Sequence, residues 1–132
     1  MEIPASQAQE LRAIVDEYIS AYNSFDLERM FGVLSDTVKF ENYSGGALTV
    51  QADGLAEFRQ LAHESKGIFA EREQRVTHWD VSAAGIKVDI AYRGKLAQDI
   101  PGGPSAGTVL DLAGTSEFAF EDGKISRIVD RA

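Results

Sequence analysis

Apolar residues recur at helical spacing near the start of the chain. They stand three or four positions apart, at Leu11, Ile14, Val15, Tyr18, Tyr22 and Phe25. This spacing places them on one face of an amphipathic helix. The segment Ser-Gln-Ala-Gln, which begins at Ser6, has the spacing of a capping box. We therefore predict that the first helix begins there.

Two shorter helices are predicted to follow. Asp26 can cap the first of them, which ends at Asp36 and has a buried face of Leu27, Met30, Phe31 and Leu34. Asp53 can cap the other, which ends at Gly67 and turns inward Leu55, Phe58, Leu61 and Ala62. Between these helices, residues 38–43 alternate as a strand does, and residues 47–50 are predicted to form a short returning strand.

The second half of the chain has the alternation of a sheet. Strands are predicted over residues 74–82, 86–98, 108–120 and 124–130, and Asp122-Gly123 before the last of them is a strong hairpin signal. Strands longer than ten residues coil, and the hollow side of a coiled sheet must be filled. We therefore expect an α+β fold, a cystatin-like cone of three N-terminal helices packed on a strongly curved antiparallel sheet.

Composition narrows the possible partners. The 132 residues fit a single domain, 1–132, and the net charge of −8 argues against binding to nucleic acid or to an anionic membrane. No stretch has the ~20 apolar residues of a membrane span and no signal peptide is visible, so a cytoplasmic location is expected. The chain has no cysteine and only two histidines, far apart, so neither a metal nor a cofactor is expected.

Three segments have a recognisable pattern: a helix pair at 18–27 (YISAYNSFDL), a helix-to-strand junction at 34–41 (LSDTVKFE) and a hairpin at 118–125 (FAFEDGKI). They resemble the opening helix pair, the junction to the first strand and the closing hairpin of the nuclear transport factor 2-like superfamily. Within that superfamily the chain looks most similar to the SnoaL-like group, which includes polyketide cyclases, and ketosteroid isomerases share the fold. The resemblance implies a conical pocket for a small apolar ligand between the helices and the concave sheet face. It also implies a homodimer formed through the outer sheet face.

Ketosteroid isomerase provides a first set of candidate residues. That enzyme holds the oxygen of its substrate with a helix-one tyrosine and a protonated aspartic acid, and an aspartate on the first strand moves the proton. By resemblance these positions fall on Tyr18, Ser116 and Asn42. Asparagine cannot take the proton, so ketosteroid isomerisation by that route is not expected. An alignment shifted by one residue would put Glu41 at the base position, but it would turn that side chain to the opposite face.

Asp130 and His78 are further candidates for proton transfer. Limonene-epoxide hydrolase has a catalytic aspartate similar in position to Asp130, after a Gly-Lys-Ile turn, although the arginine and second aspartate of its triad fall on Tyr92 and Gly94 here. An exposed acid or an ion pair is the alternative for Asp130. Histidine is the residue type whose ordinary pKa lies near neutrality, so His78 is a candidate base. It could pair with Asp80 on the same strand face, or both could belong to a polar stripe on the outer sheet.

The wall of the expected pocket is mostly apolar, with a few polar positions, as in many ligand sites. The predicted ligand-binding residues are Phe40, Asn42, Phe58, Tyr92, Leu112, Ser116 and Phe118. We interpret the protein as a small-molecule-binding pocket protein and, if it is catalytic, as a cofactor-free acid–base isomerase, cyclase or hydratase/hydrolase for an apolar carbonyl or enol compound, with Tyr18, Asp130 and His78 as catalytic candidates. The alternative is a non-catalytic, dimeric module that binds a ligand or another protein.

Overall fold

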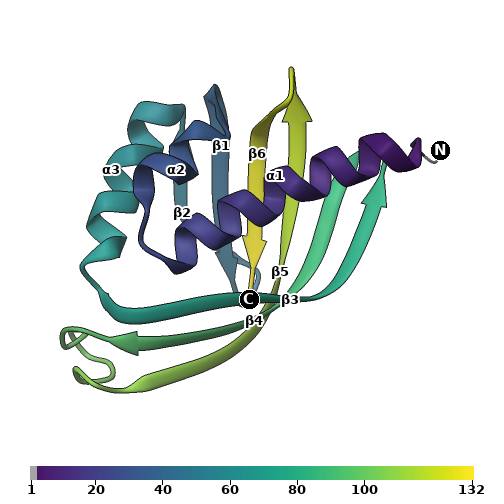
Figure 1. Cartoon of the computed structure of the whole chain (residues 1–132). Coiled ribbons are helices and arrows are strands. Elements are labelled where there is room, and N and C mark those ends of the chain that lie inside the picture. The colour runs from purple at the N-terminus through teal and green to yellow at the C-terminus, as the bar shows by residue number, and fades with distance from the viewer. Residues whose placement is uncertain (1–2) are drawn as a thin grey trace.

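Six strands form one curved, unclosed sheet beneath three helices in the computed structural model, which describes residues 3–132 (Figure 1). The elements are α1 (Ala5–Asn23), α2 (Leu27–Gly32), β1 (Leu34–Ser44), β2 (Ala47–Asp53), α3 (Leu55–Lys66), β3 (Phe69–Ser82), β4 (Gly85–Leu96), β5 (Val109–Glu121) and β6 (Lys124–Arg131). The strand order is β2-β1-β6-β5-β4-β3, and β1 pairs with β6 in parallel while the other pairs are antiparallel. The predicted α+β class is confirmed.

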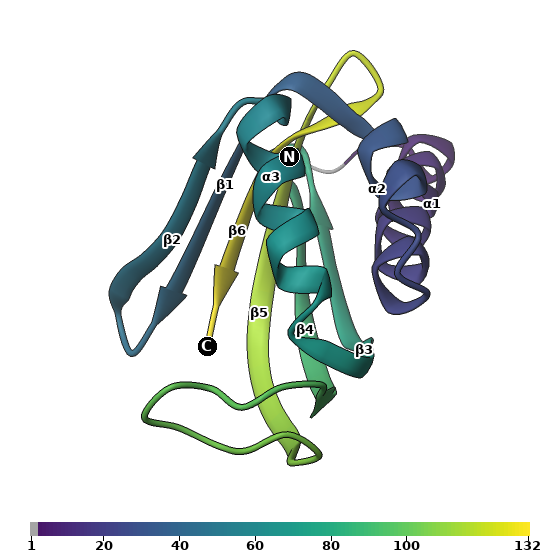
Figure 2. The same cartoon turned by 90° about the vertical axis from the view of Figure 1, so that its left-hand side faces the viewer.

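The helices cover the concave face of the sheet in two groups. α3 contacts β1 and β2, whereas α1 contacts β3 at the opposite edge and α2 joins the two helices. In Figure 2, α3 lies between the β1–β2 edge and the pair α1–α2. This arrangement leaves the space above β4, β5 and β6 to be filled by side chains or by a ligand.

Two of the three predicted helix starts differ in detail from the structure. α1 begins at Ala5 directly after Pro4, and no side chain caps it, so the capping box at Ser6 does not form. α3 follows Gly54, whose φ of 94° suits glycine, and the Asp53 amide donates to the Glu57 side chain instead of Asp53 acting as the cap. Asp26 does cap α2, as predicted.

The strands match the predicted order, and several are longer than predicted. α2 ends at Gly32, so β1 begins at Leu34, four residues before the predicted strand. β3 begins at Phe69, five residues before the predicted start at Gln74. The prediction missed this part of the strand because its inward positions carry polar residues, so it lacks the apolar alternation of a strand. The hairpin at Asp122-Gly123 is confirmed, with both residues at positive φ.

The hydrophobic core occupies one end of the cone. Its fully buried side chains include Val15 of α1, Val38 of β1 and residues from the hairpin end of the central strands, namely Ile86, Val88, Ile125 and Ile128. Farther along the same strands, toward the end of β6, the inward positions hold polar and aromatic side chains instead. The fold therefore separates a packed end from an end that contains a cavity.

Candidate functional site

A cavity of about 410 Å³ lies between the helices and the concave face of the sheet. All three helices and all six strands contribute to its wall. Six of the seven predicted ligand-binding residues lie on this wall: Phe40, Asn42, Phe58, Tyr92, Leu112 and Ser116. The seventh, Phe118, is buried behind the wall and packs edge-on against Tyr18, with ring centroids 5.9 Å apart. It supports the site from the core side.

Asp130 of β6 carries the carboxyl group of the cavity. It pairs in register with Ser116 of β5, and the Ser116 hydroxyl donates a hydrogen bond of 2.6 Å to Asp130 Oδ1. Asp130 is a wall residue that retains some exposed area, so its carboxyl can meet a bound molecule. Burial raises the pKa of Asp130 to about 6, although the hydrogen bond from Ser116 acts in the opposite direction. Within residues 3–132 no cation pairs with it.

Tyr18 of α1 is the nearby donor. Its side chain is buried on the inner face of α1. Burial raises the pKa of the Tyr18 hydroxyl well above its ordinary value, and the negative charge of Asp130 raises it further. The hydroxyl thus stays protonated at physiological pH. No described residue accepts its hydrogen, so it is free to donate to a molecule in the cavity.

A second polar group lies at the junction of α1, β3 and β4. The hydroxyls of Tyr22 and Tyr92 are 2.9 Å apart, and the guanidinium of Arg72 stacks 3.7 Å from the ring centre of Tyr22. Arg72 Nε donates a 2.8 Å hydrogen bond to the Tyr22 carbonyl, and the ring of Phe25 lies 4.4 Å from the guanidinium. Tyr22, Arg72 and Tyr92 all lie on the cavity wall.

Two hydrogen bonds hold the end of α1 on β3 beside Arg72. The side-chain amide of Asn23 donates to the backbone carbonyl of Gln74 at 3.0 Å, and the backbone N–H of Gln74 donates to Asn23 Oδ1 at 2.7 Å. Phe25 then takes a φ of 58°, which is unusual for a bulky residue, and its ring lies over Arg72. The sequence analysis missed Arg72. Extending the alternation of the predicted strand back from Gln74 by two residues would have placed it on the inner face.

The structure distinguishes the two candidates at the base position of the first strand. Asn42 is on the cavity wall, where its side chain donates to Thr49 of β2 at 2.9 Å. Glu41 is absent from the wall and accepts hydrogen bonds from Arg127 at 2.8 Å and Tyr43 at 3.0 Å. The hydrogen bond from Arg127 is the main reason that the pKa of Glu41 is lowered. Asn42, not Glu41, is therefore the residue positioned to meet a ligand.

His78 does not join the site. It is exposed and pairs with Asp89 of β4, which is also exposed, whereas the next residue, Trp79, pairs with the buried Val88. Directly paired residues share a face of a sheet, so His78 lies on the outer face together with Asp80. The prediction that His78 moves a proton in the cavity is therefore wrong, because the side chain lies on the outer face of the sheet. The strand shifts register between Val76 and His78, which changes its alternation.

Clusters of metal ligands and membrane-spanning helices are two other features that can indicate function. Within residues 3–132, no three histidine, cysteine, aspartate or glutamate side chains gather in a way that could hold a metal ion. No helix in the same range is long and apolar enough to cross a membrane.

Comparison with known proteins identifies the family. The model of the SnoaL-like domain matches residues 15–128. The chain belongs to the SnoaL-like family. This confirms the resemblance to the nuclear transport factor 2-like superfamily. No curated protein matches the chain significantly in sequence.

Several solved structures share the fold. A protein from Xanthomonas campestris pv. campestris, provisionally named a polyketide cyclase, is 21% identical, with a TM-score of 0.79 over 95% of this chain and 91% of that chain. An LEH-like epoxide hydrolase from M. tuberculosis is 17% identical, with a TM-score of 0.75 over 95% and 84%. TerC, co-crystallised with polyporic acid, is 14% identical, with a TM-score of 0.74 over 92% and 89%. At these identities the likeness shows the fold alone.

Proposed function

We propose that this SnoaL-like protein binds a small, largely apolar carbonyl or enol compound and catalyses an acid–base reaction on it, such as isomerisation, cyclisation or hydrolysis. The observation that carries the proposal is the position of Asp130 on the cavity wall with a pKa of about 6. A carboxyl group that titrates near neutrality can both take and return a proton at physiological pH. Its burial at a cavity of about 410 Å³ supports contact with a compound of two or three fused rings.

The neighbouring side chains support this chemistry. Asp130 takes a proton from a carbon next to the ligand carbonyl, and the electron pair of the broken C–H bond moves to the oxygen. The Tyr18 hydroxyl, which remains protonated, donates to the developing negative charge. The Ser116 hydroxyl, 2.6 Å from Asp130 Oδ1, keeps the carboxyl in place. Return of the proton to another atom of the ligand completes an isomerisation.

Hydrogen exchange on a simple ketone tests the proposal. 2-Tetralone, a bicyclic ketone, is incubated in D₂O with the protein, and loss of its hydrogens next to the carbonyl is followed by NMR. We expect acceleration by the wild type and a loss of about 10²- to 10⁴-fold in Asp130→Asn, which cannot take the proton. Asp80→Asn, which removes an aspartate from the outer face, is the matched control and should exchange the ketone at the wild-type rate.

Two results would contradict catalysis by Asp130. One is an equal rate for the wild type and Asp130→Asn, and the other is a wild-type rate no faster than the buffer. Either result would favour the alternative function, a non-catalytic module that binds a ligand or another protein. Assembly into a homodimer through the outer sheet face, which the superfamily resemblance supports, also remains a prediction. Light scattering after size-exclusion chromatography tests it independently of activity.

A further inference from the structure

Arg72 is a buried cation with no counter-ion. Its side chain belongs to a residue that is only 5% exposed, and within residues 3–132 no carboxylate lies within ion-pair distance of it. Four exposed arginines do reach a carboxylate oxygen, at 3.5 Å or less: Arg29, Arg59, Arg127 and Arg131. The chain has 21 acidic residues, so the missing partner of Arg72 does not reflect a shortage of acids.

The guanidinium also has unused hydrogen-bond donors. Arg72 Nε donates to the Tyr22 carbonyl, and this is the only hydrogen bond that the guanidinium makes to residues 3–132. Nη2 is fully buried without a partner. The Nε bond suits a cation at the last turn of α1, where the helix dipole is negative, and the Tyr22 carbonyl also accepts from the Phe25 amide at 3.2 Å. That structural role explains Nε and the stacking on Tyr22, but it leaves the other nitrogens without acceptors.

Phenol groups extend the same subsite. Tyr22 and Tyr92 share one hydrogen bond between their hydroxyls, so the hydroxyl that accepts it retains a free hydrogen. Arg72, Gln74 and both tyrosines lie on the cavity wall. Stacking on Tyr22 and Phe25 fixes the plane of the guanidinium, so the part of it that lines the cavity is oriented before any ligand arrives. A positive, hydrogen-bond-donating group held in this way suits the negative oxygens of a carboxylate.

We propose that the ligand of this cavity is an apolar carboxylate, with its carboxylate group bound by Arg72 and its ring system lying along the aromatic wall. The inference rests on the proposed function, because it names the substrate class of the same cavity. Arg72 is on β3 and Asp130 is on β6, with β4 and β5 between them. A ligand that spans these strands places its charge at Arg72 and its reacting carbon near Asp130.

The electrostatics support two separate ends of one site. The pKa of Tyr18 responds to both charges, because Asp130 raises it and Arg72 lowers it. The pKa of Asp130 responds to burial and to Ser116, and Arg72 is not among its causes. No ion pair joins Arg72 to Asp130 within residues 3–132, and the charges of both groups act on the Tyr18 hydroxyl. The cation remains available for a negative charge that the protein itself does not supply.

Paired probes of equal shape test the proposal. Binding of 2-naphthoate and of 2-acetonaphthone, its neutral ketone counterpart, is measured by isothermal titration calorimetry on the full chain. We expect the wild type to bind the carboxylate about ten-fold or more tightly than the ketone, as for a hydrogen bond to a charged group. Arg72→Met, which keeps the aliphatic stem, should lose this preference while its affinity for the ketone stays within about two-fold. Arg29→Met is the matched control and should retain the wild-type preference.

Several results would overturn the assignment. Equal affinity of the wild type for the two probes would do so, and this comparison needs no variant to fold. An equal loss of affinity for both probes in Arg72→Met would show that Arg72 only shapes the wall. If Asp130-dependent exchange of 2-tetralone occurs without a preference for 2-naphthoate, the proposed function stands and the carboxylate assignment fails. If the wild type preferred 2-naphthoate but did not exchange 2-tetralone, the carboxylate assignment would stand and the proposed catalysis would fail. If neither probe bound, the carboxylate assignment would be overturned.

Discussion

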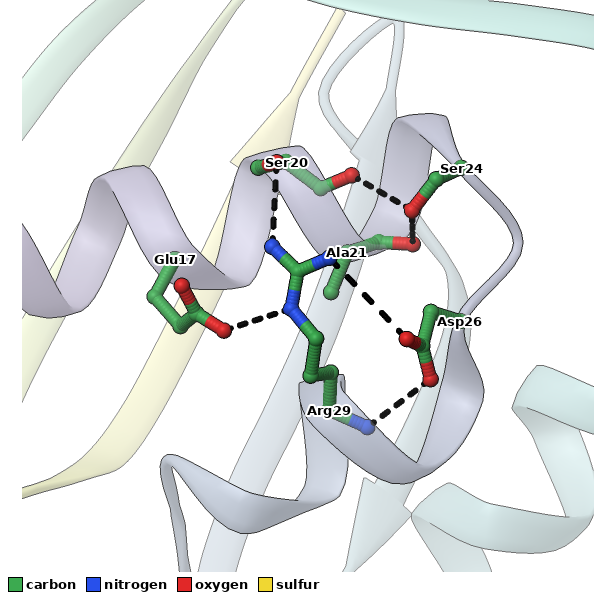
Figure 3. A network of polar contacts seen from close by, with 6 residues as sticks. All are labelled: Glu17, Ser20, Ala21, Ser24, Asp26 and Arg29. Carbon is green, nitrogen blue, oxygen red and sulfur yellow. Dashed lines mark hydrogen bonds and ion pairs between the residues drawn. The ribbon is translucent and has the colours of Figure 1, made fainter.

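Arg29 and Arg72 show two opposite environments for the same side chain. Arg29 lies on the surface of α2, with its side chain 41% exposed, and has a partner on every side (Figure 3). Its Nε is 2.6 Å from Glu17 Oε1, its Nη2 donates to Ser20 Oγ at 3.0 Å, and Asp26 lies 3.9 Å away. Arg72 is buried, has one hydrogen bond to a backbone carbonyl and meets no carboxylate within residues 3–132.

The difference separates an arginine with a structural role from one that we propose binds a ligand. Every partner of Arg29 can be replaced by water when it is lost, so the network around it holds α1 and α2 together at little gain in stability. The buried Nη2 of Arg72 has no hydrogen-bond partner within residues 3–132, and a buried charge without compensation reduces stability. A chain that retains such a group sacrifices stability for a site that awaits a partner. The same reasoning applies to Asp130, the other charged group of the wall without an ion pair.

The largest effect that we predict concerns Asp130 and pH. Its pKa rises from the ordinary 3.8 to about 6 in the folded state, so between these values the folded protein keeps a proton that the unfolded chain has lost. The free energy of unfolding therefore falls as the pH rises through this window, by about 3 kcal/mol in total. Asp130→Asn should be as stable as the wild type near pH 4 and more stable by up to about 3 kcal/mol above pH 7, as measured by urea unfolding.

The control for this prediction is again Asp80→Asn on the outer face, which should follow the wild type across the pH range. If the curves of the wild type and Asp130→Asn remained parallel from pH 4 to pH 8, Asp130 would not titrate in this window. Its contrast with the exposed acids would then disappear.

The next prediction compares the two arginines directly. Arg72→Ala opens a hole between the rings of Tyr22 and Phe25 and removes a charge-assisted hydrogen bond. We expect these losses to exceed the gain from removing the unpaired buried charge, so the variant should be less stable by about 2 kcal/mol. Arg29→Ala should leave the urea midpoint almost unchanged, because its contacts are exposed. Destabilisation of similar size in both variants would mean that burial does not distinguish the two groups.

The sequence predicted the architecture because the fold depends on local signals. The apolar repeat of α1, the cap at Asp26 and the turn at Asp122-Gly123 all depend on residues within a few positions of one another. The resemblance added Tyr18 and Asp130 to the candidate site. The closeness of Asp130 to Ser116, however, is a property of the β5–β6 register, which long-range pairing determines.

Arg72 and His78 could not be assigned from local patterns, for two different reasons. Arg72 is a charged residue at an inward strand position, so it contradicts the alternation by which inward positions are recognised. It is held there by contacts with Tyr22 and Phe25, which lie about fifty residues earlier in the chain. His78 follows a register shift that starts the alternation again, so its face depends on pairing with β4.

A smaller effect is predicted for the serine that supports Asp130. Ser116→Ala removes the hydrogen bond of 2.6 Å to the carboxylate, which stabilises the charged form. The pKa of Asp130 should then rise by about one pH unit, as followed by ¹³C NMR of the carboxyl group. Ser24→Ala in the surface network is the control, because Ser24 donates only to backbone carbonyls of α1. An unchanged pKa in Ser116→Ala would show that burial alone sets the titration of Asp130.

The smallest effect is expected where the contacts are most numerous. Glu17→Gln removes the charge that Arg29 Nε meets at 2.6 Å, yet the amide oxygen can accept the same hydrogen bond and water reaches both side chains. Any loss of stability in Glu17→Gln should disappear at high salt, because exposed pairs are screened. The preference of Arg72 for a carboxylate ligand should fall much less under the same conditions, since a buried site is screened weakly. If the interactions of the two arginines were equally sensitive to salt, Arg72 would be in contact with solvent. The argument that its charge is buried and unpaired would then fail.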